Sequence, residues 1–68
     1  MSRIVKVIEV IGESETSFDD AVRAAVKEAA KTVSGIKSVW VDNISGVVEG
    51  DTIKEFRANV KISFLVKN

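Results

Sequence analysis

The sequence contains no cysteine, no histidine, no proline and no tyrosine. Without cysteine there is no disulfide framework, and without cysteine or histidine there is no zinc site of the usual kind. A Ser-His or Cys-His catalytic couple is also excluded within one copy of the chain. We therefore predict a protein that is not an enzyme, with no catalytic residues and no resident metal site.

An excess of charge of either sign is also lacking, since ten Lys plus Arg offset ten Asp plus Glu. A neutral chain lacks the electrostatic footprint of a dedicated DNA-binding protein. The longest apolar-rich stretch, Ile4 to Ile11, is interrupted by Lys6 and Glu9 and is too short to cross a bilayer. We expect a cytoplasmic protein with neither nucleic acid nor a membrane as partner.

Apolar residues, in contrast, make up 46% of the 68 residues. A domain of about 60 residues buries only about 60% of the surface that its unfolded chain exposes. Small scaffolds without disulfides or metals commonly gain stability by oligomerising. We therefore predict a single domain spanning residues 1–68 that assembles with copies of itself.

The first half of the chain predicts a strand followed by a helix. β-Branched residues over Arg3–Ile11 favour a strand, and residues 12–16 are expected to form a loop. Ser17 has the chemistry of an N-cap, and apolar residues at spacings of three and four continue to Val33. Gly35 is well placed to end the helix in a left-handed conformation.

The second half predicts two long strands, Lys37–Glu49 and Thr52–Lys67, joined by a tight turn. Together with the first half they give an α+β fold, a βαββ domain whose three-stranded antiparallel sheet packs around one helix. Gly46, inside the first of these strands, is expected to mark a bulge or bend.

Pairing across that turn sets which side chains share a face of the sheet. If Glu49 faces Thr52, even-numbered residues of the first of these strands share a face with odd-numbered residues of the second. Shifting the pairing by one residue would move every side chain of a strand to the opposite face. The apolar face then holds Val39, Val41, Val47, Phe56, Val60 and Ile62. The more polar face holds Ser38, Trp40, Asp42, Ile44, Arg57, Asn59 and Lys61.

Several polar-face residues suggest chemistry, with alternatives that the sequence leaves open. Trp40 could be a platform for a planar ligand, a base-stacking surface, or the filling of a subunit interface. Arg57 and Lys61 could clamp a phosphate or form ion pairs at a subunit contact. Carboxylates at Glu13, Glu15, Asp19 and Asp20 could bind a cation, although acidic residues at a helix start also complement its dipole.

From end to end the chain resembles the dodecin family. The resemblance rests on KVIEVIG at residues 6–12, SETS at 14–17, FDDAV at 18–22, AKTV at 30–33 and EFRANVKISF at 55–64. No single segment is a catalytic signature, but their order and spacing are specific. The resemblance implies a hollow homododecamer built from βαββ subunits, which would cover the surplus apolar surface.

The resemblance also implies a flavin, riboflavin or FMN, that the protein binds, stores or buffers without turnover. Dodecins stack flavin rings between Trp side chains of related subunits, and a Gln bonds the ring edge. These two positions correspond here to Ser38 and Arg57, while Trp40 lies two residues, or about 6.6 Å, further along the strand. We predict a cofactor site formed by Ser38, Trp40, Arg57 and Asn59. The alternative is a shell that has lost flavin and serves as a structural or storage assembly for coenzyme A, a nucleotide or a metal ion.

Overall fold

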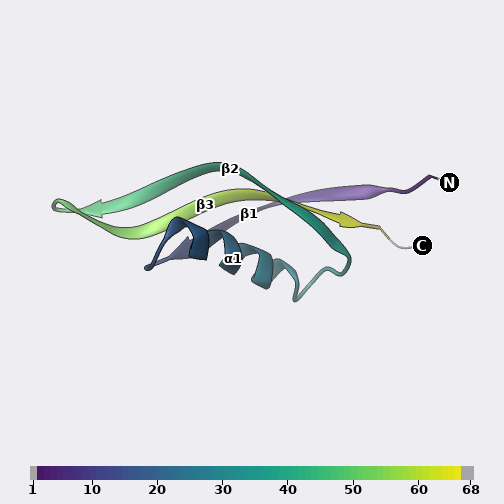
Figure 1. The fold of residues 1–68 in the computed structure, drawn as a ribbon, viewed down its shortest axis with the longest axis horizontal. Coiled ribbons are helices and arrows are strands. Elements are labelled where there is room, and N and C mark those ends of the chain that lie inside the picture. The colour runs from purple at the N-terminus through teal and green to yellow at the C-terminus, as the bar shows by residue number, and fades with distance from the viewer. Residues whose placement is uncertain (1, 67–68) are drawn as a thin grey trace.

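The computed structural model describes residues 2–66, and in that range it contains one helix and three strands (Figure 1). The elements follow the chain as β1 (Val5–Ser14), α1 (Phe18–Ala29), β2 (Ile36–Glu49) and β3 (Thr52–Leu65). The strands form an antiparallel sheet in the order β1-β3-β2, so the last strand lies between the other two. The predicted α+β, βαββ fold is confirmed; the predicted strand end at Lys67 lies outside the described residues.

Local capping fixes both ends of α1. The Ser17 hydroxyl accepts a hydrogen bond from the backbone N–H of Asp20 at 3.0 Å, which confirms the predicted N-cap. The helix ends at Ala29, earlier than predicted, because the N–H groups of Lys31 and Thr32 bond carbonyls three residues back and tighten the chain. Gly35 adopts the predicted left-handed conformation, with a φ of 75°, in the turn that leads into β2. Its predicted role as the helix cap is wrong, because α1 ends at Ala29 and its C-cap is Ala30.

Gly12, predicted to begin a loop, instead lies inside β1, opposite Ala58 of β3. Its missing side chain is required there, because a Cβ at this position would lie 2.1 Å from the carbonyl oxygen of Ala21 in α1. The helix therefore approaches β1 closely at this point. The strand continues to Ser14 because residues 12–14 keep their pairing with β3 as far as Phe56.

The predicted register between β2 and β3 is correct at Val39, which faces Ile62, and at Val41, which faces Val60. A shift between Val41 and Asn43 then leaves Asp42 without a facing residue and reverses the alternation of side chains. Ile44 consequently faces Ala58 on the helix side, so its predicted place on the polar face is wrong.

The predicted place of Val47 on the apolar face is wrong for the same reason, because it faces Glu55. Another irregularity, between Val47 and Val48, restores the register before the turn. Gly46, expected to mark a bulge, faces Phe56 between these two irregularities.

The core lies between one face of α1 and the sheet. Three alanines of the helix pack against the middle of β3, and the buried core consists of Ala21, Ala25, Ala29, Ala58, Val60 and Ile62. Alanine side chains allow the helix to lie close to the sheet, but they contribute little apolar area each. The core of one subunit is therefore small for the apolar content of the chain.

The subunit is elongated, with extents of 54 × 20 × 13 Å and a radius of gyration of 14.0 Å. A compact domain of this length has a radius of gyration of about 11 Å. Its accessible surface of 5139 Å² likewise exceeds the roughly 4,200 Å² typical of a compact monomer of this mass. The excess arises because the β2–β3 hairpin extends beyond the helix (Figure 1).

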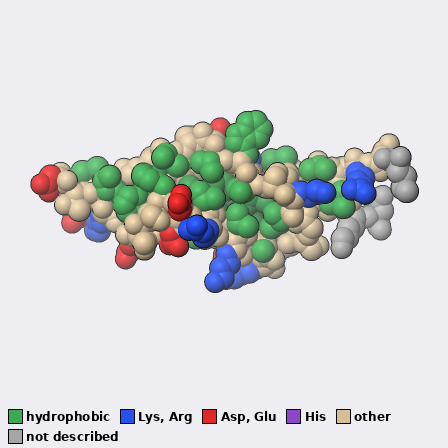
Figure 2. Space-filling model, in the orientation of Figure 1, with side chains coloured by type: hydrophobic (Ala, Val, Ile, Leu, Met, Phe, Trp, Pro, Cys, Tyr) green, Lys and Arg blue, Asp and Glu red, His purple; other side chains and the backbone are tan. Residues whose placement is uncertain are grey.

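Much of the exposed surface is apolar. The helix packs mainly over β1 and β3 and contacts β2 little, so the helix leaves its own side of β2 largely uncovered. Hydrophobic side chains gather in a band along the molecule in Figure 2. The large exposed hydrophobic residues are Ile4, Val5, Val7, Ile11, Val39, Trp40, Val41, Ile44, Val48 and Ile53. Apolar area of this extent is typical of surfaces that partner subunits cover.

Candidate functional site

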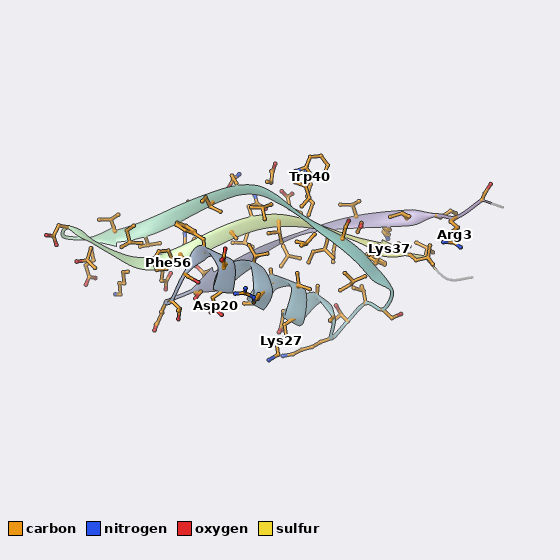
Figure 3. The ribbon with its side chains drawn as sticks, in the orientation of Figure 1. Arg3, Asp20, Lys27, Lys37, Trp40 and Phe56 are labelled. Atoms are coloured by element: carbon orange, nitrogen blue, oxygen red, sulfur yellow. The ribbon has the colours of Figure 1, made fainter. Side chains whose placement is uncertain are left out.

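The sheet face opposite α1 carries the residues that were predicted to bind a cofactor. We call it the open face, because none of the described elements covers it (Figure 3). Directly facing residues project on the same side of a sheet, so the pairing defines its members. They include Val7, Glu9, Ile11 and Glu13 of β1, Arg57, Asn59, Lys61 and Ser63 of β3, and Ser38, Trp40, Asn43 and Ser45 of β2. All four predicted site residues therefore share one face.

Trp40 is the most prominent residue of the open face. Its side chain projects away from α1 and is 70% exposed (Figure 3). The other aromatic residues of the sequence are three phenylalanines. Phe18 and Phe56 pack edge to face, with ring centroids 4.9 Å apart, on the helix side, and Phe64 shares the face of the buried Ile62. Trp40 is thus the aromatic surface that the open face offers to a planar ligand.

Ser38 lies two residues before Trp40 and faces Ser63 on β3. Their hydroxyl oxygens are 2.5 Å apart and share a hydrogen bond. This pair fills the position where the resemblance implies an aromatic platform. A planar ligand would find there a small polar surface rather than a ring.

Arg57 faces Glu13 across β1 and β3, and its Nε donates to the Glu13 carboxylate at 2.6 Å. A second carboxylate, that of Glu55, lies 3.9 Å from a terminal nitrogen of the same guanidinium. The open face therefore carries an ion pair within one subunit at this point. The N–H groups of Arg57 that are not used in this ion pair are the donors that it can offer to a ligand.

Asn59 lies between Ile11 of β1 and Asn43 of β2. Its side-chain oxygen Oδ1 is buried and has no hydrogen-bond partner among the described residues. A buried polar atom without a partner is costly, and a donor from a ligand or another subunit would remove that cost. The sequence could not have shown this feature, because it depends on what surrounds the amide.

The structure separates the four acidic residues considered for a cation. Glu13 pairs with Arg57, while Asp20 accepts a hydrogen bond from the Ser14 hydroxyl at 2.8 Å. No group of three or more Asp, Glu, His or Cys residues gathers into a metal-binding arrangement in residues 2–66.

Sequence reasoning placed Glu13 with these acidic residues and missed that it belongs to the open face. The signal that could have found it is the β1–β3 pairing, which sets Glu13 opposite Arg57.

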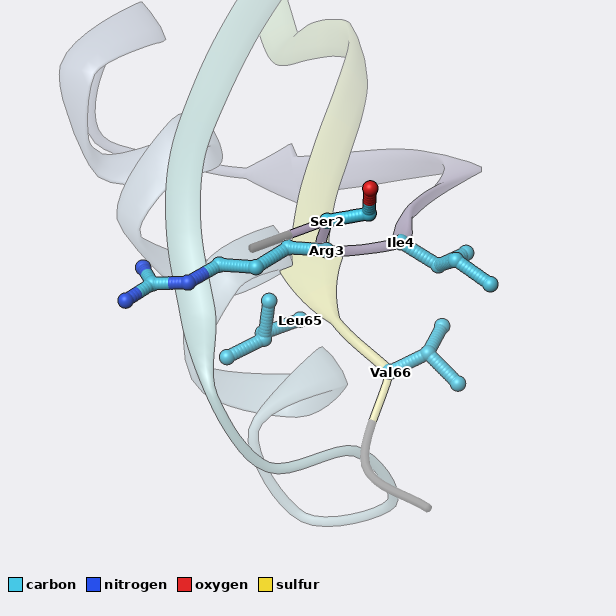
Figure 4. Close-up of a pocket in the computed structure, with 5 residues that line it drawn as sticks. All are labelled: Ser2, Arg3, Ile4, Leu65 and Val66. Carbon is cyan, nitrogen blue, oxygen red and sulfur yellow. The ribbon is translucent and has the colours of Figure 1, made fainter.

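A hollow at the end of the sheet is lined by Ser2, Arg3, Ile4, Leu65 and Val66 (Figure 4). Ile4 accepts a backbone hydrogen bond from the N–H of Val66 at 2.9 Å, which holds the two segments together. The hollow contains none of the predicted site residues.

Among residues 2–66, no helix has the length and apolar character needed to cross a membrane.

Comparison with known proteins decides the family. The family model described as Dodecin matches residues 4–67, nearly the whole chain. The chain belongs to the dodecin family. The curated dodecin of Thermus thermophilus is 28% identical over 64 residues, which cover 94% of this chain and 93% of that protein.

Solved dodecin structures have the same fold. The dodecin from Streptomyces coelicolor matches with a TM-score of 0.93 at 27% identity, covering 97% of this chain and 94% of that one. The dodecin from Streptomyces davaonensis matches with a TM-score of 0.95 over all of both chains, and at 19% identity this likeness shows the fold alone. Membership associates the chain with small flavin-binding proteins that form dodecamers.

Proposed function

We propose that the protein is a non-enzymatic homododecamer of the cytoplasm that binds, stores and buffers a flavin, riboflavin or FMN, at its subunit interfaces. The observation that carries the proposal is Trp40, an indole exposed to 70% on the sheet face that the helix leaves open. Stacking on an aromatic side chain contributes about 1 to 3 kcal/mol per ring contact in nucleobase complexes, and an isoalloxazine offers a larger ring.

The neighbouring polar residues suit the edge of an isoalloxazine, which presents one N–H donor beside carbonyl acceptors. The unpartnered Oδ1 of Asn59 can accept from such an N–H, and free N–H groups of Arg57 can donate to a carbonyl. Ser38 contributes a small polar wall through its bond to Ser63. In this proposal Trp40 supplies the stacking surface that dodecins of the flavin-binding kind have at the Ser38 position.

The shape of the subunit supports the assembly. Both edge strands of the sheet are long, with ten residues in β1 and 14 in β2, and unpaired edges of that length invite pairing with other chains. An accessible surface about 900 Å² larger than that of a compact monomer gives partner subunits area to cover. A ligand site on the open face would then be completed by a second copy.

Two observations favour a second candidate, a dodecin shell that has exchanged flavin for coenzyme A, a nucleotide or a metal ion. The Ser38 hydroxyl is already bonded to Ser63, and Arg57 is already paired with Glu13. Both positions implied to hold the flavin are thus engaged within the subunit. Titration with each of these ligands beside riboflavin separates the two candidates.

The test is a titration of riboflavin and FMN fluorescence with the assembled protein, whose mass is measured on the same sample. We expect strong quenching and a mass near twelve times that of the 7.4 kDa chain. A Trp40→Ala variant should lose the quenching, while Trp40→Phe should retain part of it and Ser45→Ala, a control on the same strand face, should retain it all. Unchanged flavin fluorescence at high protein concentration would overturn the proposal.

A further inference from the structure

The indole of Trp40 has a cationic neighbour that the proposed flavin site does not yet include. Lys61 of β3 faces Trp40 of β2 directly, so both side chains project on the open face. The Lys61 Nζ lies 6.0 Å from the centroid of the indole ring. This is the outer range of a cation–π contact, so the ammonium group sits beside the ring without being held tightly.

Lys61 is the available cation of this face, whereas Arg57 is not. Among residues 2–66, no carboxylate lies within ion-pair distance of the Lys61 ammonium, although Glu9 faces it on β1. Arg57 is held at 2.6 Å by Glu13 and lies four residues away along β3, a distance of about 13 Å. A charged group on a ligand stacked against Trp40 would therefore meet Lys61 first.

We propose that Lys61 is the residue that makes this site discriminate between a planar aromatic ligand that carries a phosphate and its parent alcohol. The inference rests on the proposed function, since it concerns a ligand stacked on Trp40. A phosphate monoester carries a charge of about −1.5 to −2 at pH 7 and three acceptor oxygens, and Lys61 supplies three donors and a positive charge. FMN accordingly binds more tightly than riboflavin.

The expected size of the preference for FMN over riboflavin follows from the solvent exposure of the ion pair between Lys61 and the phosphate. An ion pair between exposed groups is weak, because water and salt screen it. We expect FMN to bind roughly three- to fivefold more tightly than riboflavin at low ionic strength. The ratio should fall toward one near 1 M salt, where the Debye length is about 3 Å.

The experiment measures the dissociation constants of riboflavin and FMN for each variant of the assembled protein. The ratio of the two dissociation constants is compared because a variant that damages assembly lowers the affinity for both flavins by the same factor. Lys61→Gln should bring the ratio to about one, Lys61→Glu should reverse it, and Lys61→Arg should restore it. Lys54→Gln is the matched control: it removes an exposed lysine of the same strand that pairs with Glu49, far from Trp40, and should leave the ratio unchanged.

Four outcomes would overturn the inference. Equal binding of both flavins to the native protein, or a preference that persists in Lys61→Gln, would remove Lys61 from this role and leave the proposed function standing. A preference that disappears in Arg57→Gln instead would assign the phosphate to Arg57. Failure of both flavins to bind would overturn the inference and the proposed function together.

Discussion

Replacement of Gly12 by alanine tests the closest contact between the helix and the sheet. The added Cβ would lie 2.1 Å from the carbonyl oxygen of Ala21 and 3.0 Å from the Cβ of Ala25. Ordinary van der Waals contacts begin near 3.4 Å, so helix and strand must separate by more than 1 Å. The obstacle is backbone within a helix, which cannot rotate aside as a side chain could.

Overpacking a tight site costs about 1 to 3 kcal/mol, and here the separation also loosens the alanines against the sheet. We expect Gly12→Ala to lower the free energy of unfolding by about 3 kcal/mol per subunit, as measured by denaturant titration with the mass checked at each point. Gly46→Ala is the control, because its Cβ would lie 3.2 Å from the Ile53 side chain and at an ordinary contact distance of 3.7 Å from the Glu55 carbonyl oxygen, in an exposed strand. A change below about 0.5 kcal/mol for Gly12→Ala would refute the close approach of helix and strand.

Two further substitutions probe the helix start and the site. Ser17→Ala removes the oxygen that accepts from the Asp20 N–H at 3.0 Å and should cost about 1 kcal/mol in denaturant titration, while a neutral result would contradict the N-cap. Ser38→Trp replaces the hydroxyl bonded to Ser63 with an aromatic platform and should tighten flavin binding roughly fivefold to a hundredfold in fluorescence titration. No gain would indicate that the site differs from flavin-binding dodecins in more than this platform.

The sequence predicted the elements of the fold because each has a local cause. The N-cap at Ser17 follows from side-chain chemistry within a few residues. The positive φ at Gly35 follows from its lack of a Cβ, although Gly35 does not cap the helix as predicted. Alternation along β3 assigned Val60 and Ile62 to the buried face, and both are fully buried. These features need no knowledge of the rest of the chain.

The errors occurred where a distant contact decides the local structure. Gly12 resembles a loop residue, but it pairs with Ala58 of β3 and its missing side chain lets Ala21 of the helix approach the strand. Ile44 was placed on the wrong face because the irregularity after Val41 reverses the alternation, and no turn residue signals that bulge. A two-residue period cannot reveal where one strand gains a residue over its partner.

The candidate site shows the same division. Alternation placed Trp40 and Lys61 on one face, and the structure confirms that they face each other. The engagement of Arg57 by Glu13 and the unpartnered oxygen of Asn59 depend on the neighbouring strand and on burial. These two features, which govern what a ligand can bond to, follow only from the assembled sheet.

The emission of Trp40 during a titration of the native protein with riboflavin tests the central claim most directly. The chain has one tryptophan and no tyrosine, so this emission reports the proposed stacking surface without any substitution. The account predicts quenching of Trp40 in parallel with quenching of the flavin, saturating at or below one flavin per chain. Trp40 emission that stays constant while the flavin binds, or while flavin is added in excess, would contradict it.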